Sequence, residues 1–113
     1  MTPIESAILD RNILISLIGD DPQEIADFQH QFIAQAQQSL KKLAMDFNQA
    51  DFNGVKQEAH FLKTSAKAIG ALQVSDILQS IEHAAVAHDK ATTKSLILSL
   101  KHALQSLIGA IQQ

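Results

Sequence analysis

The sequence predicts an all-α fold, and three observations support this class. The 113-residue chain has only four glycines and two prolines, too few for the many tight turns of an all-β protein. It has no Trp or Tyr, so a core drawn from its 46% of hydrophobic residues must consist mainly of Leu, Ile and Ala, which favour helices. Apolar residues also recur at steps of three and four in several long stretches, as expected of amphipathic helices.

Five helical segments are predicted along the chain. They are residues 10–18, about 22–49, about 51–69, about 72–88, and a last segment that contains Leu96 to Ile111. The clearest start is that of the second segment, where the capping residue Asp21 precedes Pro22 at the first helical position. Four amphipathic helices with short connections pair their apolar faces most simply in an antiparallel up-down four-helix bundle. We expect residues 1–113 to form one such domain, with the short N-terminal helix covering one end.

Composition excludes several classes of function. The chain has no cysteine, which rules out disulfides, thiolate metal sites and cysteine nucleophiles. No apolar run approaches the roughly 18 residues of a membrane span, and the N-terminus lacks the order of a signal peptide, so we expect a cytoplasmic protein without a membrane segment. The net charge of −3 gives no field that would attract nucleic acid. His83 and His88 do not share a helix face, which argues against a zinc site.

His60 lies on the outer side of the predicted helix 51–69. At about 100° per residue, it falls roughly 130° from the centre of that helix's apolar stripe. Lys56, Lys63 and Lys67 fall on the same side. A neutral imidazole offers a lone pair without a separate base, and lysines can offset the charge of about −2 that a phosphoryl group brings. A histidine among lysines is also ordinary helix surface, so geometry alone leaves both interpretations open.

A local signature surrounds this histidine. The segment Ala59-His60-Phe61-Leu62-Lys63-Thr64-Ser65-Ala66 is followed by Gly70-Ala71, and Leu78-Gln79-Ser80-Ile81-Glu82 comes downstream. These segments resemble the signature of histidine-containing phosphotransfer (HPt) domains. That signature is Ala-His-x-Leu-Lys-Gly with two small residues, then Gly-Ala or Gly-Leu, and Leu-x-x-Leu-Glu further along. The ordered set of segments is more specific than any one of them.

The resemblance implies a phosphoryl carrier of a bacterial-type phosphorelay, in two-component signal transduction. His60 would accept a phosphoryl group from an aspartyl phosphate and pass it to another aspartate. The implied partners are receiver domains of response regulators and of a hybrid sensor histidine kinase. The chain would bind no cofactor, Mg²⁺ being held by the receiver, and it would have no ATP site or autokinase activity, since it lacks a Gly-rich phosphate loop. We expect a monomer.

The resemblance also assigns the residues around His60. Lys63 would lie beside the phosphoryl group, with Lys67 nearby. Glu82 stands where the family commonly has Gln or Glu bonded to the imidazole; by accepting from Nδ1 it would leave Nε2 free to attack, although a solvated acid is the plainer interpretation. Thr64 replaces the usual Gly one turn after His60, and we expect it to affect access to the imidazole.

Two alternatives accompany this interpretation. The first is a helical adaptor or inhibitor that keeps the bundle but acts only by binding; the combination of His60, Lys63 and Glu82 argues against it. The second concerns Phe61, which lies roughly 130° from its helix's stripe centre, on the side opposite His60. We expect this ring to pack against a neighbouring helix rather than to form an exposed docking patch.

Overall fold

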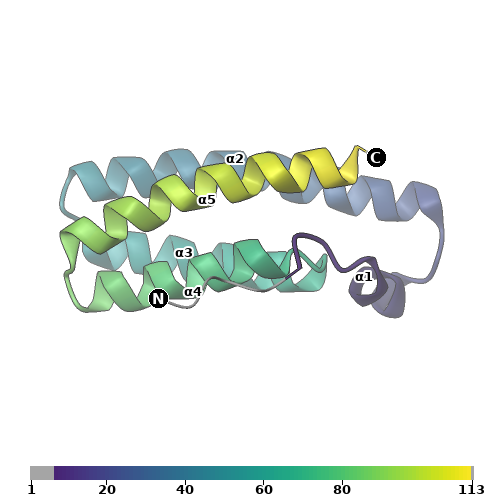
Figure 1. Cartoon of the computed structure of the whole chain (residues 1–113), viewed down its shortest axis with the longest axis horizontal. Helices are drawn as coiled ribbons and strands as arrows, with labels where there is room; N and C mark the ends of the chain where they lie inside the picture. The colour runs from purple at the N-terminus through teal and green to yellow at the C-terminus, as the bar shows by residue number, and fades with distance from the viewer. Residues whose placement is uncertain (1–6, 113) are drawn as a thin grey trace.

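The computed structural model describes residues 7–112 of the chain and contains five α-helices in that range (Figure 1). The helices are α1 (Arg11–Ile18), α2 (Pro22–Asn48), α3 (Phe52–Ala68), α4 (Leu72–Val86) and α5 (Lys90–Ile111). No β-strand occurs in the described part of the chain. For the first four helices, the sequence-based ranges differ from these bounds by at most two residues, the usual uncertainty of helix ends. Helix α5 begins at Lys90, six residues before Leu96, the first residue of its predicted apolar stripe.

The four long helices form a closed bundle. Helix α3 packs against α2 and α4, and α5 packs against the same two helices from the other side. Successive long helices run in opposite directions, and α1 lies across one end, where it contacts α2 and α3 (Figure 1). The all-α fold class, a four-helix bundle with a short additional N-terminal helix, is therefore confirmed.

The helix ends follow from local sequence. An aspartate caps the N-terminus of four helices, each side chain accepting a hydrogen bond from a backbone N–H in the first turn; these are Asp10, Asp21, Asp51 and Asp89. Three turns between long helices begin with a residue of positive φ, namely Ala50, Gly70 and His88. Such a residue closes the Schellman motif, in which backbone N–H groups after the helix satisfy its last carbonyls.

Gly70 illustrates why one of these positions needs glycine. Its φ is 81°, and a Cβ on this residue would overlap the backbone carbonyl oxygen of Asp10. The Asp10 N–H also donates a 2.8 Å hydrogen bond to the Gly70 carbonyl. The segment that enters α1 is thereby held against the turn between α3 and α4.

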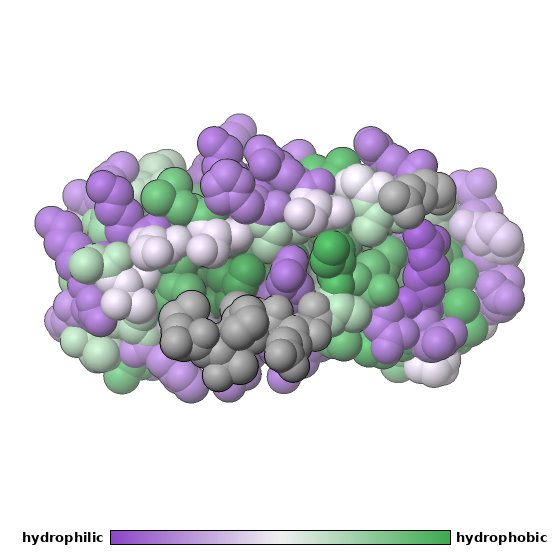
Figure 2. Space-filling model, in the orientation of Figure 1, coloured by the Kyte–Doolittle hydropathy of each residue, from purple (hydrophilic) through white to green (hydrophobic). Residues whose placement is uncertain are grey.

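The core consists mostly of aliphatic side chains from all five helices. Those that are completely buried include Leu43, Val55, Leu62, Leu78, Ile81, Leu100 and Leu107. On the face with α4 and α5 in the foreground, hydrophilic residues line the edges and hydrophobic ones lie in the seam between the helices (Figure 2). Among the described helices, none combines the length and apolar character needed to cross a membrane.

Candidate functional site

His60 lies in the middle of α3 and points away from the core. The buried stripe of this helix consists of Val55, Ala59, Leu62 and Ala66. Because these residues face the core, the side chain of His60 faces outward. The His60 side chain is 68% exposed. An imidazole this accessible can be approached by another protein.

Glu82 of α4 reaches across to this histidine. Its Oε1 lies 2.8 Å from Nδ1 of His60, and its Oε2 lies 2.5 Å from Nζ of Lys63. The side chains of Glu82 and Lys63 are only 13% and 17% exposed. One half-buried carboxylate therefore joins two residues of the neighbouring helix, with one oxygen for each.

The charge of Glu82 fixes the tautomer of His60. Burial alone would raise the pKa of the Glu82 carboxyl, but hydrogen bonds from Lys63 and His60 hold that pKa below its ordinary value. The carboxyl is thus ionised at neutral pH, and an ionised carboxylate only accepts hydrogen bonds. The hydrogen in the His60–Glu82 contact must be on Nδ1. In the neutral ring, Nε2 then carries the free lone pair.

A groove of about 350 Å³ lies between α3 and α4 at this point. Six of its seven lining residues have polar or charged side chains, and the lining comes from two stripes, one on each helix: Lys56, His60 and Lys63 on α3, and Gln79, Glu82, His83 and Val86 on α4. Both stripes have the spacing of three and four residues that places side chains on one helix face. The groove is large enough to hold a phosphoryl group next to the imidazole.

The other two residues expected near His60 lie outside this groove. Thr64 and Lys67 are exposed on α3, and neither belongs to the groove lining. Thr64 lies one turn after His60 on the outer surface. Lys67 is in the last turn of α3, where its charge also interacts favourably with the helix dipole.

Sequence reasoning missed the contribution of α4 beyond Glu82. His83 and Val86 line the groove, and Val86 is 64% exposed. A signal was present, because Gln79, Glu82, His83 and Val86 follow the spacing i, i+3, i+4 and i+7 of one helix face. That signal gains meaning only once Glu82 is known to face His60.

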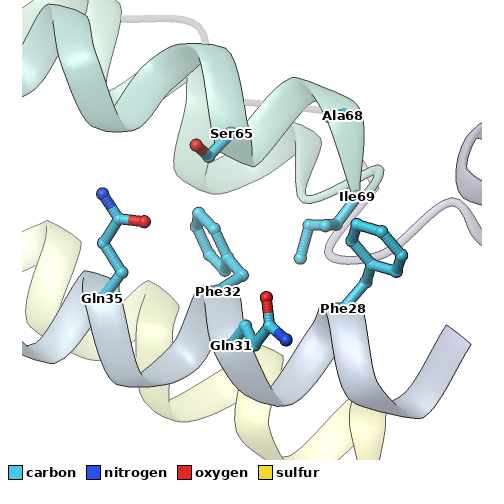
Figure 3. Close-up of a pocket in the computed structure, with 7 residues that line it drawn as sticks. All are labelled: Phe28, Gln31, Phe32, Gln35, Ser65, Ala68 and Ile69. Carbon is cyan, nitrogen blue, oxygen red and sulfur yellow. The ribbon is translucent and has the colours of Figure 1, made fainter. Parts of the chain in front are cut away.

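A second groove, of about 230 Å³, lies on the other side of α3, toward α2. Figure 3 shows side chains of α2, among them Phe28 and Phe32, extending toward Ser65 of α3 and Ile69, the residue directly after α3. Most of its lining surface is apolar, and Phe28 is 47% exposed. The two grooves thus flank one helix.

The expectation that Phe61 packs against a neighbouring helix is wrong, since this ring is 56% exposed. Each long helix of the bundle has two long neighbours, and those of α3 are α2 and α4. Whereas Glu82 of α4 reaches His60, most of Phe61 is left uncovered by either neighbour. Phe61, which follows His60 in the sequence, therefore contributes to the apolar surface of the molecule.

The helical bundle agrees with a match to a known family. Residues 27–113 match the Hpt domain, and the chain belongs to this family. It is a histidine phosphotransfer protein of phosphorelay signalling, and members of this class carry phosphoryl groups rather than act as enzymes and interact with receiver domains.

A solved structure shares the fold. The histidine-containing phosphotransfer protein B (HptB) from Pseudomonas aeruginosa PAO1 matches with a TM-score of 0.87, covering 96% of this chain and 95% of that one at 18% sequence identity. A comparison with curated proteins gives no match.

Proposed function

We propose that His60 is the residue that carries the phosphoryl group, with Nε2 as the attacking atom. The observation that carries this proposal is the hydrogen bond from Nδ1 of an exposed histidine to an ionised, half-buried carboxylate. It orients the ring and leaves Nε2 as the nucleophile.

The transfer step needs no base from this chain. The Nε2 lone pair attacks the phosphorus of an aspartyl phosphate; the N–P bond forms while the P–O bond to the aspartyl carboxylate breaks, and that carboxylate leaves with the electron pair. The ring keeps its proton on Nδ1 and becomes positively charged. Glu82 offsets this charge. The reverse step onto a second aspartate restores the neutral ring.

Neighbouring residues have supporting roles in this proposal. Lys63 holds Glu82 in place through its ion pair and lies beside the phosphoryl group in the groove. Lys67 adds positive charge nearby, and Thr64 limits how closely a partner can approach the imidazole. These roles follow from the positions of the side chains along α3 and from the charge of the transferred group.

The apolar groove between α2 and α3 is the docking surface for a receiver domain in this proposal. Its exposed Phe28 and the exposed Phe61, which follows His60 in the sequence, offer apolar contact area for a partner. Exposed aromatic rings of this kind are common anchors of protein interfaces. The polar groove toward α4 is then left for the phosphoryl group.

The remaining parts of the proposal concern the setting. The partners are receivers of response regulators and of a hybrid sensor histidine kinase, which hold the Mg²⁺ of the reaction. Residues 1–113 act as one monomeric domain in the cytoplasm, without autokinase activity.

Phosphotransfer from a labelled receiver tests the acceptor. The wild-type protein should gain acid-labile, base-stable label, the behaviour of phosphohistidine, and His60→Gln should gain none. His102→Gln, which changes an exposed histidine on α5, is the matched control and should be labelled like the wild type. Label that persists in His60→Gln would overturn the assignment, and a stable complex without any label would favour the binding-only adaptor.

A further inference from the structure

The positive charge of Lys63 is already neutralised before any phosphoryl group arrives. Its ammonium is 2.5 Å from Glu82 Oε2, and both side chains are mostly shielded from water. Low exposure strengthens such a pair and makes its separation costly. Lys63 and Glu82 together therefore bring almost no net charge to the groove.

Among the described residues, Lys56 is the lysine of the groove lining that forms no ion pair. It lies one turn before His60 on α3, lines the same groove and is exposed. No carboxylate lies within ion-pairing distance of its ammonium among the described residues. Residues four apart on a helix have Cβ atoms about 5–6 Å from one another, which is within reach of a lysine side chain.

We propose that Lys56 is a second phosphoryl-binding residue, whose ammonium contacts the phosphoryl oxygens on His60 while Lys63 stays paired with Glu82. This proposal rests on His60 being the acceptor. The two lysines would then have different tasks: Lys63 positions the carboxylate that orients the ring, and Lys56 neutralises the transferred group.

The charge of the transferred group explains why a second cation is needed. A phosphoryl group brings about −2 charge into the groove. The new positive charge of the ring offsets one of these charges, while Glu82 and Lys63 offset each other. Without Lys56, the described groove lining would hold no unpaired lysine to offset the remaining negative charge. Because Lys56 is exposed, its contribution should be modest and should weaken as salt is added.

The experiment measures transfer to the 113-residue chain from two donors, a phosphorylated receiver and the small donor phosphoramidate. We expect Lys56→Gln to slow labelling of His60 by about three- to tenfold at low salt with both donors, and Lys56→Arg to restore most of the rate. Lys101→Gln makes the same change of charge on α5, where the residue is exposed, and should leave the rate unchanged.

A second readout reports contact with the phosphoryl group itself. A nearby cation favours the dianionic form, so Lys56→Gln should raise the pKa of the phosphoryl group on His60, followed by ³¹P NMR of the labelled protein. Lys101→Gln should not move it.

The outcomes separate this proposal from the assignment of His60. If the wild type is labelled on His60 but Lys56→Gln equals Lys101→Gln in rate and in phosphoryl pKa, the role of Lys56 is rejected and the acceptor stands. A loss of rate with the receiver alone, at unchanged phosphoryl pKa, would also reject it, because Lys56 would then contact the partner instead. Absence of label on the wild-type His60 would reject both.

Discussion

The two sides of α3 border grooves that differ in their lining residues. Toward α4, the groove is lined by charged and polar groups around His60. Toward α2, the groove is lined mainly by apolar surface with two phenylalanines. One helix thus presents His60 in a groove of charged and polar residues on one side and borders a more apolar groove on the other. In the proposed function, the first groove serves the chemistry and the second the recognition of a partner.

A carboxylate links α3 to its neighbour on each side. Glu82 joins α4 to His60 and Lys63, whereas Glu58 of α3 accepts a 2.7 Å hydrogen bond from the Ser39 hydroxyl of α2. Both carboxylates are half-buried. The two carboxylates differ in their partners. Glu58 accepts a hydrogen bond from a neutral serine hydroxyl, whereas Glu82 contacts an imidazole and a charged ammonium group, which a reaction can use.

Removal of Glu82 should have the largest effect on transfer. Glu82→Ala eliminates the acceptor for Nδ1 and leaves the Lys63 ammonium without its partner, so we expect phosphotransfer to fall about ten- to a hundredfold, as the loss of one charge-assisted hydrogen bond of roughly 1.5–3 kcal/mol implies. The rate of His60 labelling by a phosphorylated receiver measures this loss.

Glu58→Ala is the matched control on the other side of α3. It should lower the free energy of unfolding by about 1 kcal/mol and leave transfer unchanged. Equal losses of transfer in Glu82→Ala and Glu58→Ala would mean that transfer depends on any hydrogen bond between α3 and a neighbouring helix. The proposed difference between the two sides of α3 would then be rejected.

Truncation of Phe28 should affect recognition but not chemistry. We expect Phe28→Ala to raise KM for a phosphorylated receiver about five- to tenfold, the range for loss of an aromatic anchor worth slightly over 1 kcal/mol. Labelling by phosphoramidate should not change, because this small donor needs no docking surface. Leu98→Ala removes a similarly exposed apolar side chain on α5 and should change neither; an equal rise in KM would contradict the docking role.

The pH dependence of stability should differ between wild type and Glu82→Gln. Burial alone raises the pKa of Glu82, but Lys63 and His60 hold it below the ordinary value, which the unfolded chain retains at about 4.3. The ionised carboxyl therefore stabilises the fold fully above that ordinary pKa, and this contribution is lost as the pH falls through the lower, folded pKa.

Denaturant unfolding at several pH values measures this effect. The stability advantage of wild type over Glu82→Gln should be constant near neutral pH and shrink below about pH 4. An advantage that stayed constant down to pH 2 would show that the ion pair does not stabilise the fold.

The smallest effect is expected at Thr64. If its branched side chain restricts approach to His60, Thr64→Gly should speed transfer from a receiver by about two- to threefold, which corresponds to roughly 0.5 kcal/mol of barrier. The more flexible helix should be slightly less stable. Thr64→Ala, which also removes the branch, separates clearance from flexibility; slower or unchanged transfer in both variants would eliminate the idea.

The fold could be predicted from sequence because its signals are local. The apolar stripes mark the helices, and Asp21-Pro22 and Gly70 mark ends that the structure contains. The outward direction of His60 follows from the same periodicity. Each of these features depends on residues within a few positions of one another.

The site required information that no periodicity contains. The contact of Glu82 with His60 depends on how α4 is rotated against α3, and only the family resemblance pointed to it. The same rotation brings His83 and Val86 into the groove; their spacing from Glu82 places them on one helix face but does not say which neighbour that face meets. Phe61 was misjudged for a related reason, since its environment depends on which helices surround α3 and not on α3 alone.

The tight turn at Gly70 has a consequence for how the site can change. His60 lies ten residues before this glycine and Glu82 twelve residues after it, so that the two side chains meet roughly 15–18 Å along their helices from the turn. One residue added between Gly70 and Glu82 would rotate the carboxylate by about 100° and shift it by about 1.5 Å. The site thus depends on the number of residues between His60 and Glu82 as much as on which residues they are. Side chains between the two positions can vary more freely than the length of this segment.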